Sequence, residues 1–116
     1  MTINQLVKRS ASKPLDASIV GTTCKELNMS ENDFYDAFAR HAAGEFLKNF
    51  DLWDDCDMAM NHLFGFASAI RKHILPDFAF SVYLAFDAGE VGKPDDPKNF
   101  DTHSRTKEQL TKLGFK

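Results

Sequence analysis

The sequence predicts an all-α protein, a compact single-domain bundle of five to six helices that spans residues 1–116. Three observations lead to this prediction. Apolar residues recur every three or four positions along most of the chain, which is the period of an α-helix. Capping residues, Gly and Pro punctuate these stretches. A nine-residue apolar run at 78–86, broken only by Ser81, could form a buried strand, but no other stretch reads as a strand that could pair with it.

The first two predicted helices are short. Thr2 and Gln5 have the spacing of a capping box, so we expect a helix at 3–12. Asp16 can cap a second helix at 17–28. The residues of this second helix that would face inward are Ile19, Val20, Cys24 and Leu27.

The two central helices have the most regular patterns. Ser30 and Asp33 can cap a third helix, in which apolar residues recur every four positions. Those residues are Phe34, Phe38, Ala42, Phe46 and Phe50. Asp51 can cap a fourth helix, which Pro76 would end. Its apolar seam alternates in steps of three and four through Trp53, Cys56, Met60, Leu63, Ala67, Ile70 and Ile74.

From these two seams we expect Phe38, Phe46, Leu63 and Ile70 to lie in the core. The run at 78–86 is predicted to be a buried helix for lack of a strand partner, and residues 89–103 a long polar loop. Ser104 can open a last short helix, which would end in a closing motif at Gly114 and Phe115.

The stretch CKELNMSENDFYDAF, residues 24–38, has the rhythm of a helix-turn-helix. Over some twenty residues it is similar to the turn of bacterial repressors of the tetracycline-repressor type. It departs from a DNA reader in charge, because the second helix would present Glu31, Asp33 and Asp36 to the phosphates. DNA affinity rests largely on cations that neutralise phosphates. We therefore expect a plain helix pair and no nucleic-acid partner.

The sequence contains no residue pattern typical of an active site or a cofactor site. The Gly-rich phosphate loop, the nucleophile elbow and the His-Glu-x-x-His motif do not occur. Cys24 and Cys56 are too few for a disulfide framework, and each falls at an apolar helix position. His41 and Glu45 could be half a metal site but more often are plain surface residues, and His62 and His73 would lie too far apart to share one metal. We expect no catalytic residue, metal or cofactor.

Charge is distributed unevenly along the chain. Residues 31–101 carry 14 acidic and 6 basic side chains, whereas the two flanks together carry 8 basic and 3 acidic ones. The acidic middle has two clusters at predicted helix starts, which suit the positive end of the helix dipole. The second cluster surrounds an aromatic side chain, a combination that suits capture of a basic protein surface. The predicted partner-binding residues are Asp33, Asp36, Trp53, Asp54, Asp55 and Asp57.

These observations favour a non-enzymatic protein-interaction domain. A concrete version is an immunity protein or antitoxin that blocks a basic toxin through an acidic surface. The alternative is a helical ligand- or cofactor-binding protein with a pocket among its eleven Phe residues. No apolar run is long enough to span a membrane, and the basic first fifteen residues lack a hydrophobic signal core, so a cytoplasmic location is expected.

Overall fold

The computed structural model describes residues 2–90 and 102–115, and in these residues it contains helices and no strand. The elements in chain order are α1 (Ile3–Ser10), α2 (Ala17–Glu26), α3 (Glu31–Lys48), η1 (Phe50–Leu52), α4 (Trp53–Gly65), η2 (Phe66–Ile70), α5 (Asp77–Glu90) and α6 (Thr102–Lys112). This confirms the all-α prediction, including the helix over the apolar run at 78–86. Most of the predicted polar loop, residues 91–101, lies outside the described residues, and α6 begins two residues before Ser104.

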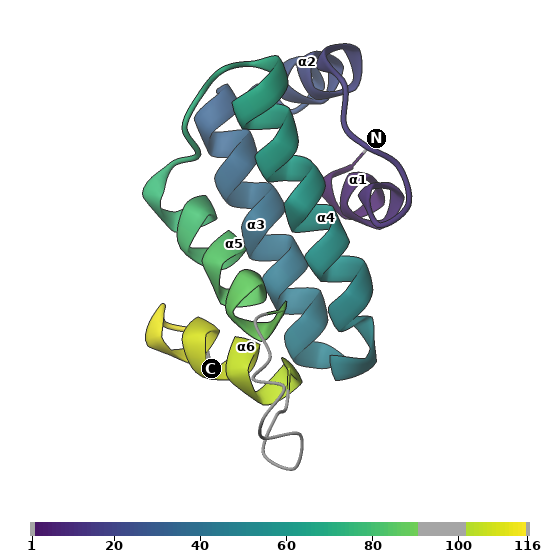
Figure 1. Cartoon of the computed structure of the whole chain (residues 1–116). Helices are drawn as coiled ribbons and strands as arrows, with labels where there is room; N and C mark the ends of the chain where they lie inside the picture. Colours follow the sequence, from purple (N-terminus) through teal and green to yellow (C-terminus); the bar gives the residue numbers. More distant parts are fainter. Residues whose placement is uncertain (1, 91–101, 116) are drawn as a thin grey trace.

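Helices α3, α4 and α5 pack against one another and form the centre of the fold (Figure 1). α3 and α4 run antiparallel, α1 packs across both of them, α2 contacts α3, and α6 packs on α5. One continuous set of buried side chains joins these helices. Phe38, Phe46 and Leu63 are fully buried in it, as the seams predicted.

Local signals define most of the helix ends. Thr2 and Gln5 form the predicted capping box, since each side chain accepts a hydrogen bond from the other residue's backbone N–H. Asp16 accepts from the N–H of Ile19 at 2.8 Å and Ser30 from that of Asp33 at 3.1 Å, so both predicted N-caps are confirmed.

Residues with left-handed backbone end two of the helices. Asn28 follows α2 with φ 53°, and Gly114 follows α6 with φ 103°. In both cases the next N–H reaches back to the helix, from Met29 to the carbonyl of Cys24 and from Phe115 to that of Leu110. This hydrogen bond is the mark of a Schellman motif, and it confirms the predicted ending at Gly114.

The cap predicted for the fourth helix is wrong. Asn49 accepts a hydrogen bond from the N–H of Asp51 at 3.1 Å and opens the short 3-10 helix η1. Asp51 lies inside that turn, and no side chain caps α4 directly. Because η1 precedes α4, the helical segment begins at Phe50 and not at Asp51 or later. Asn49 is therefore the polar residue in front of it.

The end predicted for the fourth helix is also wrong. α4 gives way after Gly65 to a π-helical turn, η2, and the chain then leaves the helix with Lys72 at φ 52°. A π turn holds more residues than an α turn, so a seam spaced for an α-helix drifts off its face. Ile70 is 53 % exposed and Ile74 is 84 % exposed, which corrects their predicted places in the core. Leu27, at 41 % exposure, is likewise not an inward residue.

Candidate interaction surface

The two predicted acidic clusters lie at opposite ends of the α3–α4 pair. Asp33 and Asp36 belong to the first turns of α3, and Asp54, Asp55 and Asp57 to the first turns of α4. Because the two helices are antiparallel, the starts of α3 and α4 point to opposite ends of the bundle (Figure 1). The acidic residues therefore form two separate patches.

The patch at the start of α3 takes part in holding the fold together. The carboxylate of Glu31 accepts from the guanidinium of Arg71 at 2.8 Å, which ties α3 to the end of η2. Asp36 is half-buried and accepts from the backbone N–H of Ala79 at 3.2 Å. Ala79 is in the first turn of α5, so Asp36 acts as an N-terminal cap supplied by a neighbouring helix. In this group, Asp33 is exposed.

Trp53 lies inside the fold, at 8 % exposure. Its indole Nε1 donates to the hydroxyl of Thr106 at 2.8 Å, and that hydroxyl donates to the carbonyl of Ala85 at 3.0 Å. The ring also packs beside Phe86, with 6.3 Å between centroids. Trp53 thus connects α4 with α5 and α6, and this ring is not available at the surface as an anchor.

The remaining residues of the second patch differ in exposure. Asp54 and Asp55 are exposed in the first turn of α4. Asp57 is buried at 6 % exposure, and its Oδ2 accepts from the side-chain amide of Asn61 at 3.5 Å. The surface charge at this end of α4 therefore comes from Asp54 and Asp55, together with the exposed Asp51 of η1.

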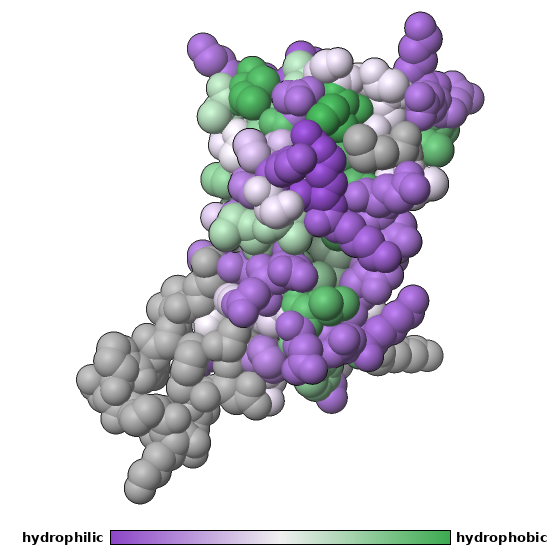
Figure 2. Space-filling model, turned by 90° about the vertical axis from the view of Figure 1, so that its right-hand side faces the viewer, coloured by the Kyte–Doolittle hydropathy of each residue, from purple (hydrophilic) through white to green (hydrophobic). Residues whose placement is uncertain are grey.

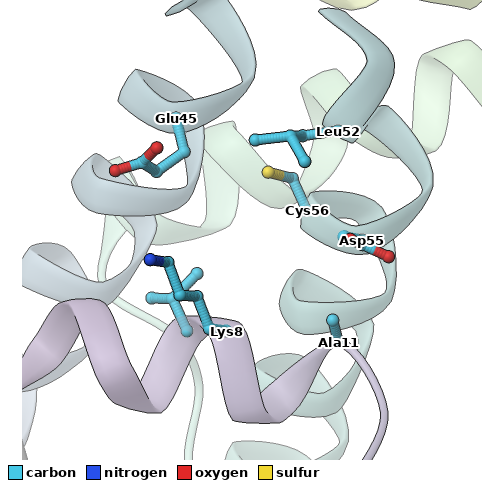
Figure 3. Close-up of a pocket in the computed structure, with 7 residues that line it drawn as sticks. Lys8, Ala11, Glu45, Leu52, Asp55 and Cys56 are labelled. Atoms are coloured by element: carbon cyan, nitrogen blue, oxygen red, sulfur yellow. The ribbon is translucent and has the colours of Figure 1, made fainter. Parts of the chain in front are cut away.

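A pocket of about 250 Å³ lies between α1, α3 and the start of α4, and of these exposed carboxylates Asp55 is the one that lines it. Its lining is largely apolar, and the lining residues are Val7, Lys8, Ala11, Glu45, Leu52, Asp55 and Cys56. Figure 3 shows the side chains of Leu52 and Cys56 directed into the space between the helices, whereas Asp55 lies at its edge. The pocket is therefore apolar inside and acidic along part of its margin.

Figure 2 shows the side of the molecule that lies at the right of Figure 1, where α1 is. Much of this surface is hydrophilic, and hydrophobic residues form separate small patches on it. On α3, Glu45 lies at 3.2 Å from the imidazole of His41, which also contacts the side chain of Asn4 at 2.9 Å. This His-Glu pair links α3 to α1. In the described part of the chain, no three His, Cys, Asp or Glu residues are grouped so that they could hold a metal ion.

The thiol of Cys56 is expected to be unreactive, because it stays protonated at neutral pH. Burial, followed by the carboxylates of Asp55 and Glu45, raises its pKa from 9.0 to about 12. Burial also raises the pKa of the Cys24 thiol. A thiol that keeps its proton is a poor nucleophile and a poor metal ligand. Cys56 therefore contributes apolar surface to the pocket.

Sequence reasoning missed this pocket because its wall comes from three helices. The acidic margin is visible in the sequence, and so is the apolar stripe of α1 that includes Val7. Their meeting depends on how α1 packs across α3 and α4. No Phe of the described residues lines this pocket, and Phe66 is the Phe that lines a second pocket, between α2, α3 and η2.

Comparison with known proteins adds no relative to this description. No family model matches the chain, and neither the curated proteins nor the solved structures gave a significant match. No helix in the described ranges combines the length and the apolar character that a membrane crossing requires.

Proposed function

We propose that this chain is a protein-binding domain that captures a basic partner at the start of α4. The observation that carries the proposal is the apolar pocket with the exposed carboxylate of Asp55 among its lining residues. An acidic rim speeds association with a basic surface and orients it, whereas a buried anchor in a pocket slows dissociation. This end of the molecule has both features.

The anchor comes from the partner in this arrangement. Trp53 is buried against Thr106, so the protein offers a cavity here instead of a protruding ring. At about 250 Å³ the pocket is smaller than most small-molecule sites, which occupy about 300–1,000 Å³. It suits one side chain of a partner with an apolar stem, such as Leu, Met or the aliphatic part of Arg or Lys.

Several charges around the pocket favour a cationic guest. Asp55 and Glu45 line it, and the exposed Asp51 and Asp54 are close to Asp55 in the chain. Lys8 is the one cation among the lining residues, and its flexible stem can swing toward solvent. Two carboxylates and one cation are therefore among the lining residues, so the lining carries a net negative charge.

The concrete function that we propose is that of an immunity protein or antitoxin. Such a protein needs a surface that covers the basic, phosphate-binding site of a toxin, and it needs no chemistry of its own. The unreactive thiol of Cys56 and the acidic rim are compatible with this role. A toxin would present Lys and Arg side chains at the site where it binds nucleic acid.

The test uses a partner recovered by pull-down with the full chain and then surface plasmon resonance. In the double variant Asp54→Asn/Asp55→Asn, we expect slower association and a weaker dependence on salt, because rim charges mainly steer the encounter. Asp33→Asn is the control, since Asp33 is also an exposed carboxylate and belongs to the first turn of α3, at the other end of the bundle.

A second variant tests the pocket. Ala11 lines it and is half-buried, so Ala11→Met would fill part of the cavity without a change in charge. We expect faster dissociation and an unchanged association rate. If the double Asn variant associates like the wild type at low salt, and Ala11→Met dissociates like it, the start of α4 is not the binding site.

A further inference from the structure

A second surface feature lies where α4 meets α5. Phe64 of α4 stacks on Tyr83 of α5 with 4.4 Å between ring centroids and 11° between the ring planes. Phe80 extends this stack, at 6.1 Å from Tyr83 and 6.3 Å from Phe64. We call these three rings, together with Leu84, the aromatic face.

The aromatic face is partly open to solvent. Phe80 is 38 % exposed and Leu84 is 45 % exposed, whereas large core side chains such as Phe38 and Phe86 are fully buried. Phe80 and Leu84 are four residues apart, so they are neighbours on one side of α5. Exposed apolar side chains that cluster in this way mark interaction surfaces more often than scattered ones do.

Acidic residues frame the aromatic face. On α5, Asp77, Phe80, Leu84 and Asp87 follow one another in steps of three, four and three, so a carboxylate flanks the apolar pair at each end. Asp77 is exposed and Asp87 is half-buried. The sequences of α4 and α5 together contain six Asp or Glu residues and no Lys or Arg. Asp77 and Asp87 are ten residues apart, which is roughly 15 Å along a helix.

The carboxylates around the aromatic face indicate which kind of molecule could bind there. A second copy of the chain would place α5 carboxylates against α5 carboxylates, and an anionic lipid surface would meet the same repulsion. A helix with an apolar centre and a cation at each end matches both the apolar pair and the flanking charges. Within this chain, cations already lie over Phe rings, with Arg40 4.5 Å from the ring centre of Phe78 and Lys107 5.6 Å from that of Phe50.

We propose that the aromatic face is a second docking surface, which binds a basic amphipathic helix of a partner protein. The partner helix lays two apolar residues against Phe80 and Leu84 and places a Lys or Arg near Asp77 and another near Asp87. This is the helix-in-groove mode of recognition, in which apolar anchors sit at helical spacing. The proposal concerns a surface of α4 and α5, and it does not depend on the pocket between α1, α3 and α4.

The test uses a fluorescein-labelled, Ala-rich 18-residue peptide with one row of Lys, Leu, Leu and Lys in steps of three, four and three. Its control peptide has Glu in place of both Lys residues. We expect the Lys peptide to bind the wild-type protein at least tenfold more tightly than the Glu peptide in fluorescence anisotropy. In NMR spectra of the full chain, its addition should shift the amide signals of Phe64, Phe80, Tyr83 and Leu84.

Two variants separate this surface from others. Phe80→Gln/Leu84→Gln should weaken binding of the Lys peptide at least tenfold, with an unchanged circular dichroism spectrum. Leu27→Gln/Ile74→Gln replaces two other exposed apolar residues and should change the affinity less than twofold. The variant Ala11→Met, which fills the pocket of the proposed function, should also bind the Lys peptide normally.

The proposal is overturned if the Phe80 and Leu84 variant binds the Lys peptide as the wild type does, or if the Glu peptide binds equally well. Self-association would also overturn it: sedimentation equilibrium would then show a dimer of the wild-type protein and a monomer of the Phe80→Gln/Leu84→Gln variant. Binding of the wild type, but not of the variant, to vesicles of phosphatidylcholine and phosphatidylglycerol would overturn it in favour of a membrane surface.

Discussion

Thr106→Val tests the buried hydrogen bond that fastens α6 to the rest of the fold. Thr106 is fully buried and its hydroxyl accepts the indole N–H of Trp53 at 2.8 Å. The same hydroxyl donates to the carbonyl of Ala85 at 3.0 Å, so one oxygen joins α4, α5 and α6. Valine has nearly the shape of threonine, and the substitution removes the hydroxyl while it keeps the packing.

Thr106→Val leaves the indole N–H of Trp53 buried without a hydrogen-bond acceptor, and this determines the expected loss of stability. An indole N–H at a buried site without an acceptor costs about 1–3 kcal/mol, so we expect the free energy of unfolding to fall by about 2 kcal/mol. With a urea m-value of about 1–3 kcal/mol/M, the unfolding midpoint would move down by about 1 M. Trp53 is the single tryptophan of the chain, so its fluorescence reports on this contact directly.

A double-mutant cycle separates the energy of the hydrogen bond between Trp53 and Thr106 from the other effects of each substitution. In the background Trp53→Phe, the side chain has no N–H, and Thr106→Val should then cost much less than in the wild type. Unfolding of all four proteins is followed by far-UV circular dichroism in urea, which does not need the indole. An equal cost of Thr106→Val in both backgrounds would show that Trp53 and Thr106 are not coupled, and the proposed role of the indole would be refuted.

The other predictions concern the core, a cap, a thiol and DNA. Leu63→Ala should cost about 2–5 kcal/mol because it leaves a cavity, whereas Ile70→Ala should cost less than about 1 kcal/mol at 53 % exposure; similar costs in urea titrations would mean that the faces of α4 and η2 are misplaced. Asp36→Ala should cost about 0.5–2 kcal/mol, as loss of an N-cap does, because the N–H of Ala79 loses its acceptor; an unchanged midpoint would exclude the cap. Burial raises the pKa of the Cys56 thiol from 9.0 to about 12, so stability should fall as pH rises above 9.0, where the thiol of the unfolded chain ionises first. Cys56→Ala should flatten this slope; an unchanged or steeper slope in that variant would contradict the assignment. Duplex DNA should not bind more tightly than micromolar in an anisotropy titration, because carboxylates lead α3; tighter binding that added salt weakens would contradict this.

The two binding proposals rest on separate observations and can fail separately. Asn substitutions at Asp54 and Asp55 test the exposed carboxylates at the start of α4, and Gln substitutions at Phe80 and Leu84 test the aromatic face. If both hold, the chain can contact one large basic partner on two sides of α4, or two partners at once. Competition between the Lys peptide and the recovered partner would distinguish these arrangements.

Features that depend on neighbours in the sequence could be predicted without the structure. The caps at Thr2, Asp16 and Ser30 and the closing motif at Gly114 involve hydrogen bonds between residues that are three to five positions apart. The helical state of 78–86 followed from the lack of a strand partner, which is a property of the whole sequence.

Only the tertiary structure decided how those helices use their side chains. Periodicity placed Trp53 on an apolar seam but could not show that its N–H meets Thr106, 53 residues away. From the sequence, Asp36 is a carboxylate on the surface of a helix. In the structure it accepts a hydrogen bond from the backbone N–H of Ala79, in the first turn of α5. The π turn that exposes Ile70 breaks the α-helical period, so a search for that period cannot see it. Short-range hydrogen bonds are encoded by adjacent residues, whereas burial and long-range partners exist only once α1, α3, α4, α5 and α6 have packed.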